Sequence, residues 1–494
     1  MTRSFIKEWA APLFIIAVLA IVAYLPTLTQ PFISDDYPGI KRSLSFSISG
    51  WESLAKDPVE RPRATTFIFS YAIYHLFGMC PAAFYSANIL LHVLNCWLLF
   101  AAGRWRAFGY RVSFWAAAFF AVYEGHSEAI MWSSACNELL MFFFGFLSFI
   151  FWLIFLEREK ARLRWLALSF FFFLPSLLSK ESAVIFVALF ALPLFFPPHQ
   201  SKGRLVCLPR WLRTNLIGGR HADLRLRYMG LRQAPYLLPH ALICVAYVIS
   251  IFMARAQSLR FHNQSFVLSA PFWVTWTNSY GRMLWFWGLS ATISMFLWGR
   301  SGRSEGRPET KRVEDRWSMV EDRLRSDDSA LDPRSSTIDL RSSIFVSFLW
   351  MGIGFIPYMF VDYMHRIPSR HTYLASAGLG WLMGATIVVM KDRYAKNYKW
   401  APPVILSLIL SHNVAYLWTK KRHQFLERAQ PTERLIALAR GVDGPIFVKC
   451  FPPNMAQIHA EAALELILNK PADTLIWSEE EARKRPPAAV FCYE

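Results

Sequence analysis

The sequence contains no closely spaced cysteines and few charged residues. Its seven cysteines are scattered over 494 residues, and no two of them form a Cys-x-x-Cys pair, the spacing that many zinc sites and thiol redox motifs use. Charged residues make up only 18% of the chain, whereas hydrophobic residues make up 54%. No zinc site or redox motif is therefore indicated, and the composition is typical of a membrane protein.

Long apolar runs recur along the chain. A helix needs about 20 apolar residues to cross a bilayer, and several runs reach or approach that length. The first run is longer than the apolar region of a signal peptide, so we expect it to remain as an anchor. The fold class predicted is an all-α polytopic membrane protein with about eleven transmembrane helices, at 10–29, 83–102, 113–124, 138–156, 165–179, 182–198, 235–254, 271–298, 344–361, 372–390 and 401–418.

The net charge of +18 would suit a nucleic-acid-binding protein, but its distribution indicates a membrane topology instead. Lys and Arg concentrate in alternate loops, at 104–111, 158–164, 199–234 and 391–399. Because cytoplasmic loops carry the excess of positive charge, these loops are predicted to be cytoplasmic. The other loops and the tail after Trp418 are then extracytoplasmic. The bilayer is an expected partner, and nucleic acid is not.

Four segments are predicted. Residues 1–298 and 344–418 form the transmembrane core. Residues 299–343 are dense in charge, which predicts a disordered cytoplasmic insert, with a short surface helix as the alternative. Residues 419–494 contain a strand-like run at 445–450 and a helical pattern at 455–468, so a small extracytoplasmic α/β segment is expected. Its Cys450 and Cys492 would form a disulfide in an oxidising compartment or remain free thiols.

Two adjacent carboxylates, Asp35 and Asp36, follow the first apolar run. Like charges this close repel each other and raise one pKa, which suits a general base or a pair of metal ligands. The sequence does not distinguish which aspartate is the base. The acidic pair lies on the predicted outer face.

Other unusual polar residues are predicted to share that face and to form one site with the acidic pair. Each group has a structural alternative. Hydrogen bonds between helices, a local ion pair at a turn, or contacts with lipid headgroups would also explain them. The candidates are Arg61, Glu124, His126, Glu128, Lys180, Glu181, Arg366, Arg370, His371 and Tyr373.

Five short stretches occur in the order found in a known class. They are Ser34-Asp-Asp-Tyr37, Arg61-Pro-Arg63, His126-Ser-Glu-Ala-Ile-Met-Trp132, Ser179-Lys-Glu181 and Arg370-His-Thr-Tyr-Leu-Ala-Ser-Ala-Gly378. Together they resemble the GT-C class of polyprenyl-phosphate-sugar-dependent glycosyltransferases, and within it the protein O-mannosyltransferase-like group, which includes enzymes that carry tetratricopeptide repeats. The chain departs from that pattern in four ways: it has no repeat array, Ala375 replaces a proline, Ala135-Cys-Asn137-Glu138 replaces an Arg-acidic pair, and the insert 299–343 has no counterpart.

The resemblance implies an inverting transfer of a sugar, a mannose-like hexose being favoured, from a polyprenyl-phosphate donor to a protein or glycan acceptor. The location implied is the extracytoplasmic face of a membrane, the bacterial inner membrane being favoured. No cofactor is required, although a divalent metal is possible. The resemblance also implies a role for each residue. Asp35 or Asp36 is the base, and Asp35, Asp36 and Glu124 are the ligands if a metal takes part. The residues expected to bind the donor phosphate are Arg366, Arg370, His371 and Lys180, and those expected around the substrate are Arg61, Glu124, His126, Glu128, Glu181 and Tyr373.

A transporter or flippase of a lipid-linked sugar is the alternative. Transporter sites usually lie near the bilayer midplane, whereas the polar residues here are predicted at one face. The apolar segments also lack repeated charges and an internal hydropathy repeat.

Overall fold

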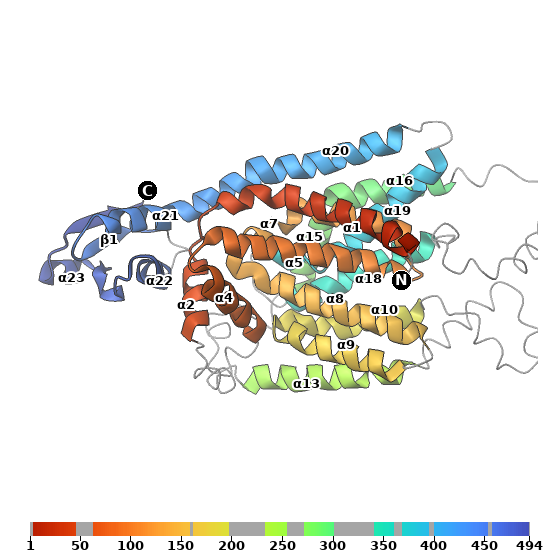
Figure 1. The fold of residues 1–494 in the computed structure, drawn as a ribbon, viewed down its shortest axis with the longest axis horizontal. Coiled ribbons are helices and arrows are strands. Elements are labelled where there is room, and N and C mark those ends of the chain that lie inside the picture. The colour runs from red at the N-terminus through yellow and green to blue at the C-terminus, as the bar shows by residue number, and fades with distance from the viewer. Residues whose placement is uncertain are drawn as a thin grey trace, which may run out of the picture.

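The computed structural model describes residues 3–45, 63–158, 162–196, 233–253, 271–300, 340–359, 368–394, 400–452 and 457–493. Most of its helices lie side by side in one bundle, and a small α/β unit projects from one end (Figure 1). Of the predicted insert, 301–339 lies outside the described residues. The bundle comprises α1 (Arg3–Tyr24), α5 (Pro81–Ala101), α6 (Gly109–Val122), α8 (Cys136–Glu157), α9 (Arg162–Leu177), α10 (Phe186–Phe195), α13 (Leu238–Met253), α15 (Phe272–Met283), α16 (Leu289–Arg300), α18 (Leu340–Phe355), α19 (Ser376–Tyr394) and α20 (Ala401–Tyr416).

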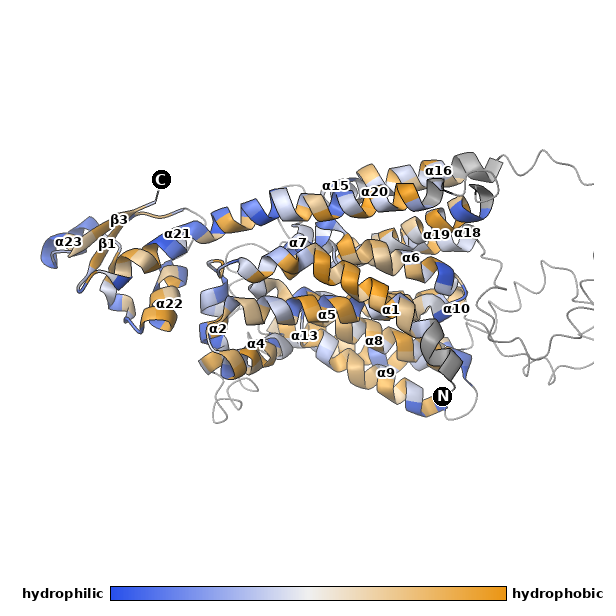
Figure 2. Ribbon diagram, turned by 45° about the horizontal axis from the view of Figure 1, so that its top comes forward, coloured by the Kyte–Doolittle hydropathy of each residue, from blue (hydrophilic) through white to orange (hydrophobic). Residues whose placement is uncertain are grey.

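The bundle is apolar along most of its length (Figure 2). Each of the eleven predicted segments overlaps a helix of the structure. Four helical stretches of the described chain are long and apolar enough to cross a bilayer, and the protein is therefore an integral membrane protein; the figure of eleven spans stays a prediction. The four are Trp9–Thr29, Pro81–Arg104, Ser133–Glu157 and Ala234–Met253, and shorter apolar helices run over Ala64–Phe77, Glu181–Phe195 and Ser342–Tyr358.

Helix α19 packs closely against α6 and α18, because its glycines leave room for the neighbouring backbones. A Cβ on Gly384 would lie 2.3 Å from the Val112 carbonyl oxygen, and one on Gly378 would lie 2.6 Å from that of Ser347. Small residues permit such close contact between membrane helices. This packing fixes the segment just before α19, which carries Arg370.

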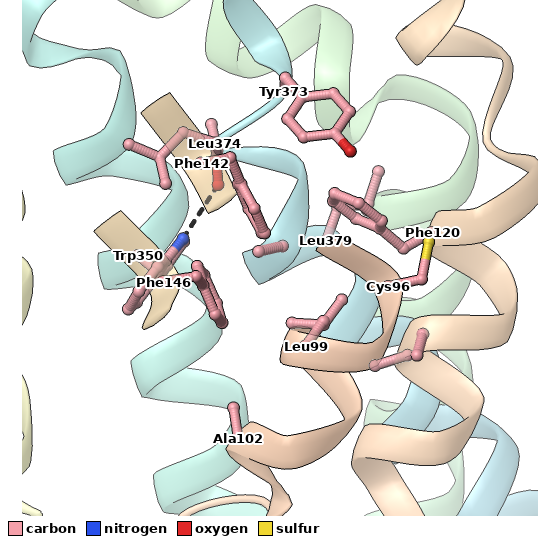
Figure 3. Close-up of a cluster of buried hydrophobic side chains, with 14 of the residues drawn as sticks. Cys96, Leu99, Ala102, Phe120, Phe142, Phe146, Trp350, Tyr373, Leu374 and Leu379 are labelled. Atoms are coloured by element: carbon pink, nitrogen blue, oxygen red, sulfur yellow. Dashed lines mark hydrogen bonds between the residues drawn. The ribbon is translucent and has the colours of Figure 1, made fainter. Parts of the chain in front are cut away.

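Aromatic and aliphatic side chains pack together in a buried cluster of the bundle (Figure 3). Phe142 and Phe146 of α8 stack on each other with ring centroids 4.3 Å apart. Trp350 donates its indole N–H to the Leu374 carbonyl at 3.0 Å, so α18 also holds the start of α19. The core therefore supports the end of the bundle at which the polar loops lie.

That end, here called the α2 end, carries two helices that were not predicted within the loop 30–82. They are α2 (Asp36–Ser45) and α4 (Ala64–Phe77). Two basic residues of a predicted cytoplasmic loop lie at the opposite end of the bundle (Figure 1), where Arg104 pairs with Glu157 at 3.0 Å and Arg111 pairs with Asp392. Within the described residues, this loop and the loop that carries the acidic pair thus lie at opposite ends of the bundle, and the side of the membrane that each one faces stays a prediction.

A long helix connects the bundle to the C-terminal α/β unit. Helix α20 continues through the π-turn Leu417–Lys421 into α21 (Arg422–Arg440), so the predicted helix end at Trp418 is not observed. The predicted strand and helix of the tail are confirmed. The unit contains β1 (Ile446–Cys450), α22 (Gln457–Leu468), β2 (Leu475–Ile476), α23 (Glu479–Lys484) and β3 (Ala489–Cys492).

The three strands form a parallel sheet in the order β2-β1-β3. Cys450 and Cys492 face each other on β1 and β3 and form a disulfide. The unit shares a hydrophobic core with α2, in which Phe32, Tyr37 and Ile40 pack with residues of α21 and α22. The C-terminal unit is therefore attached to the α2 end by side-chain packing as well as by the chain.

Candidate functional site

The acidic pair lies where α2 begins, and its two carboxylates have opposite environments. The Asp35 side chain is 44% exposed, and its Oδ1 lies 3.0 Å from the His459 Nε2 of α22. Asp36 is 1% exposed. Only Asp35 can therefore meet a substrate without a rearrangement of the loop.

Asp36 holds the loop in shape. Its Oδ2 accepts the Ile33 backbone N–H at 2.9 Å, and its Oδ1 accepts the Ser134 backbone N–H at 2.7 Å. Burial raises the pKa of Asp36 to about 7, although the two backbone hydrogen bonds oppose that rise. A buried carboxyl group with both oxygens engaged by backbone N–H groups is suited to fixing a loop.

The segment Trp132–Ser134 joins the acidic loop to Arg370. Besides its backbone bond to Asp36, Ser134 donates its hydroxyl to the Asp35 carbonyl at 2.9 Å. Two residues earlier, the Arg370 guanidinium stacks over the Trp132 ring, with its carbon 4.9 Å from the ring centroid. The carboxylates and the arginine, far apart in sequence, are thus gathered on one short segment.

Glu128 positions this arginine and a second one. Its Oε2 accepts the Arg370 backbone N–H at 3.2 Å, and its Oε1 lies 3.6 Å from a guanidinium nitrogen of Arg428 on α21. Burial would raise the pKa of Glu128, but the Arg370 N–H and the charges of both arginines outweigh burial and hold the pKa below its usual value. Arg428, which is half-exposed, is a cation that the predicted site did not include.

A buried network lies beneath Arg370 and centres on Glu138, which is fully buried. Glu138 pairs with Lys180, and its Oε1 lies 2.5 Å from the His371 Nδ1. The Tyr358 hydroxyl donates to its Oε2 at 3.1 Å. Lys180 and His371 were predicted to bind the donor phosphate. The structure buries both side chains against the Glu138 carboxylate, and their predicted role on the phosphate stays a prediction.

His126 and Tyr373 also lie in the interior, below the surface of the site. His126 Nε2 lies 2.6 Å from the Ser376 Oγ, and the Tyr373 hydroxyl lies 2.7 Å from the His92 Nδ1. Both side chains are fully buried. Their contacts tie α5, α19 and the segment after α6 together, so we interpret them as supports rather than as substrate contacts.

The remaining predicted residues lie at the rim of the site or outside the described residues. Glu181 pairs with Arg63, at 3.6 Å between Oε1 and Nε. Glu124 lies between α6 and α7 (Ser127–Ile130), and burial raises its pKa. Arg61 and Arg366 lie outside the described residues.

The possible metal ligands are not gathered. Within the described ranges, no group of three His, Cys, Asp or Glu side chains lies close enough to hold a metal ion. Asp35 contacts His459, and Asp36 accepts two backbone N–H groups. Asp35, Asp36 and Glu124 therefore do not form a metal cluster in this arrangement, and a metal requirement stays untested.

Sequence reasoning did not identify four residues that the structure brings to the site. Glu138 was noted only as a departure from a motif, and Tyr358 stands in an apolar run that carries no signal of its own. Arg428 and His459 fall in the tail, whose contact with the acidic loop no local pattern indicates. Only the position of Glu138, at the start of a helix after an outer loop, was a usable signal.

No protein-family model matches the chain, and no curated protein matches it. Among solved structures, ArnT from Cupriavidus metallidurans bound to undecaprenyl phosphate is similar with a TM-score of 0.43 and 14% identity, over 98% of this chain and 89% of that one. The same protein in its apo state gives 0.42 and 15%, over 98% and 89%. The Archaeoglobus fulgidus oligosaccharyltransferase tethered to an acceptor peptide gives 0.44 and 10%, over 93% of this chain and 64% of that one.

Proposed function

We propose that this protein is a membrane glycosyltransferase of the GT-C class, which moves a sugar from a polyprenyl-phosphate donor to an acceptor hydroxyl. One observation carries the proposal: at one end of an apolar bundle, the segment Trp132–Ser134 contacts both the backbone of Asp35, whose carboxylate is accessible, and the Arg370 guanidinium. A lipid-linked donor needs that combination, because its chain lies in the bilayer and its phosphate lies at the surface.

The reaction proposed is a single displacement. Asp35 accepts the proton of the acceptor hydroxyl, and the acceptor oxygen forms a bond to the anomeric carbon of the sugar. The bond from that carbon to the phosphate oxygen breaks, and its electron pair leaves with the polyprenyl phosphate. The configuration of the anomeric carbon is inverted because attack and departure occur on opposite sides. The exposure of Asp35 favours it over the buried Asp36 as the base.

Arg370 and Arg428 are the proposed phosphate ligands. Guanidinium groups match phosphate oxygens in geometry and stabilise the charge that develops as the phosphate departs. Both lie near the Trp132 ring, at 4.9 and 6.0 Å from its centroid. The Glu138 network beneath them would then hold the segment that carries Arg370, rather than bind phosphate itself.

The finer identity of the reaction rests on the resemblance in sequence. A mannose-like hexose, a protein or glycan acceptor and the bacterial inner membrane are proposed on that ground. The extracytoplasmic face is supported further by the disulfide between Cys450 and Cys492, which lies at the α2 end, because disulfides persist in oxidising compartments. No cofactor is proposed, and a divalent metal remains to be tested by chelation.

The test is transfer by purified protein in liposomes. Labelled polyprenyl-phosphate hexoses and an acceptor extract are supplied, and glycosylated product is measured beside the movement of labelled lipid across the bilayer. The proposed function requires a new glycosidic product. Movement of labelled lipid without any product would support the flippase instead and refute the proposal.

Arg370→Ala is expected to lower kcat/KM for the donor by about 10- to 100-fold, because a charge-assisted hydrogen bond contributes about 1.5–3 kcal/mol. Arg370→Lys should restore only part, since an ammonium group lacks the fork of the guanidinium. Donor titrations of the purified variants provide the measurement. Arg111→Ala, which removes an exposed arginine at the opposite end, is the matched control and should retain wild-type kinetics; equal kinetics for the Arg370 and Arg111 variants would contradict the assignment.

A further inference from the structure

The C-terminal unit brings a side chain to the acidic pair. His459 lies on α22, more than 400 residues from Asp35 along the chain, and its Nε2 is 3.0 Å from the Asp35 Oδ1. The imidazole side chain is 15% exposed, whereas the carboxylate is 44% exposed. The imidazole is therefore mostly enclosed and the carboxylate is accessible, an arrangement in which His459 can orient Asp35.

The position of His459 is fixed by the docking of α22 on α2. The two helices share a hydrophobic core, in which Ile40 packs with Ala463 and Leu464. Lys41 on α2 pairs with Glu465 on α22. The Tyr37 hydroxyl donates to Glu433 of α21 at 3.2 Å. Several independent contacts thus set where the imidazole lies relative to Asp35.

The other attachments of Asp35 leave its side chain free to rotate. Ser134 contacts its backbone carbonyl, and so does the Gly39 N–H at 3.2 Å. A carboxylate on the surface without a side-chain partner samples several rotamers, and a base must be held within a narrow range of geometry. An Nε2–H group that donates to Oδ1 restricts the rotation and leaves the second oxygen for the acceptor hydroxyl.

We infer that His459 is a positioning residue, which orients the Asp35 carboxylate for proton abstraction, so that the C-terminal unit forms part of the active site. This inference rests on the proposed function. His459 keeps its own proton throughout, and the acceptor proton goes to Asp35. The imidazole is thus neither a base nor a nucleophile in the reaction.

The test compares three single variants in the liposome transfer assay. His459→Ala is expected to lower kcat by about 10- to 100-fold, the scale of loss for a misplaced catalytic group, with little change in KM for the donor. His459→Gln should restore part of the rate, because its amide N–H can occupy the place of the imidazole Nε2–H. His423→Ala is the matched control: it removes an exposed histidine of α21 that pairs with Glu427, and it should retain wild-type rates.

A fourth comparison separates orientation from mere docking. On the background Asp35→Asn, adding His459→Ala should change the remaining rate by less than about threefold, because residues that act as a unit lose their effects together. If His459→Ala folds poorly, the kcat of His459→Gln relative to that of the wild type still tests the role of the imidazole.

Three outcomes are distinguishable. Reduced kcat in His459→Ala, partial rescue by glutamine and no further loss on the Asp35→Asn background support the inference. Rates for both His459 variants equal to that of His423→Ala overturn it and leave the proposed function standing. Absence of product from the wild type with every donor overturns the proposed function, and the role of His459 falls with it.

Discussion

Asp35→Asn is expected to slow sugar transfer by about 10²- to 10⁴-fold, the contribution typical of a general base. The substitution keeps the size of the side chain and a hydrogen-bonding oxygen for His459, but it removes the group that accepts the acceptor proton. Because the side chain is 44% exposed, its charge contributes little to the fold, and the thermal stability should stay near that of the wild type. Single-turnover transfer with bound donor measures the effect.

Asp36→Asn is the matched comparison for this prediction. It places an NH₂ group against one of two backbone N–H donors, those of Ile33 and Ser134, so a hydrogen bond of the loop is lost. We expect a lower melting temperature together with a partial loss of transfer. If Asp35→Asn kept wild-type turnover, Asp35 would not be the base, and the proposed mechanism would lose its proton acceptor.

Lys180→Met is expected to cost about 3–5 kcal/mol of stability, the scale for removing one partner of a buried ion pair. The reason is that Glu138 is fully buried and would lose its cationic partner, keeping only the His371 and Tyr358 contacts. The loss is measured as the change in the free energy of unfolding, with the protein in detergent and unfolded by denaturant or by heat. Sugar transfer should fall too, because His371, the neighbour of Arg370 in the chain, is held by Glu138.

The double variant Lys180→Met with Glu138→Gln tests the cause. Removing both charges should recover part of the stability, because no isolated charge then remains in the interior. Lys484→Met is the matched control: it breaks an exposed ion pair with Glu480 on α23 and should cost under about 1 kcal/mol. A Lys180→Met variant as stable as this control would show that the network does not support the fold.

The sequence predicted the bundle better than it predicted the site. The apolar runs located the helices of the bundle, because that signal is local in the chain, whereas the topology drawn from the Lys/Arg asymmetry stays a prediction. The amphipathic α2 and the apolar α4 were missed, since a loop of mixed composition shows neither a long run nor a clear period.

The residues of the site illustrate why local sequence patterns do not predict its geometry. Asp35 and Asp36 are neighbours with the same chemistry, and only the direction in which α2 begins makes one accessible and the other buried. Lys180 and His371 resemble phosphate ligands in sequence, yet both are buried against Glu138, a residue to which no motif assigned a role. His459 reaches Asp35 only because a long helix leads the chain back over the α2 end.

That helix has a mechanical consequence. From Ala401 to Arg440 it continues without a break, a length of roughly 60 Å at about 1.5 Å per residue, which is twice the roughly 30 Å thickness of the hydrocarbon core. A rod of this kind acts as a lever, with one arm among lipid chains and the other in water. A change in bilayer thickness that tilts the inner arm would displace the outer arm, and with it the unit that carries His459. The rate of the proposed sugar transfer would then respond to the membrane in which the protein is placed, through the angle of one helix.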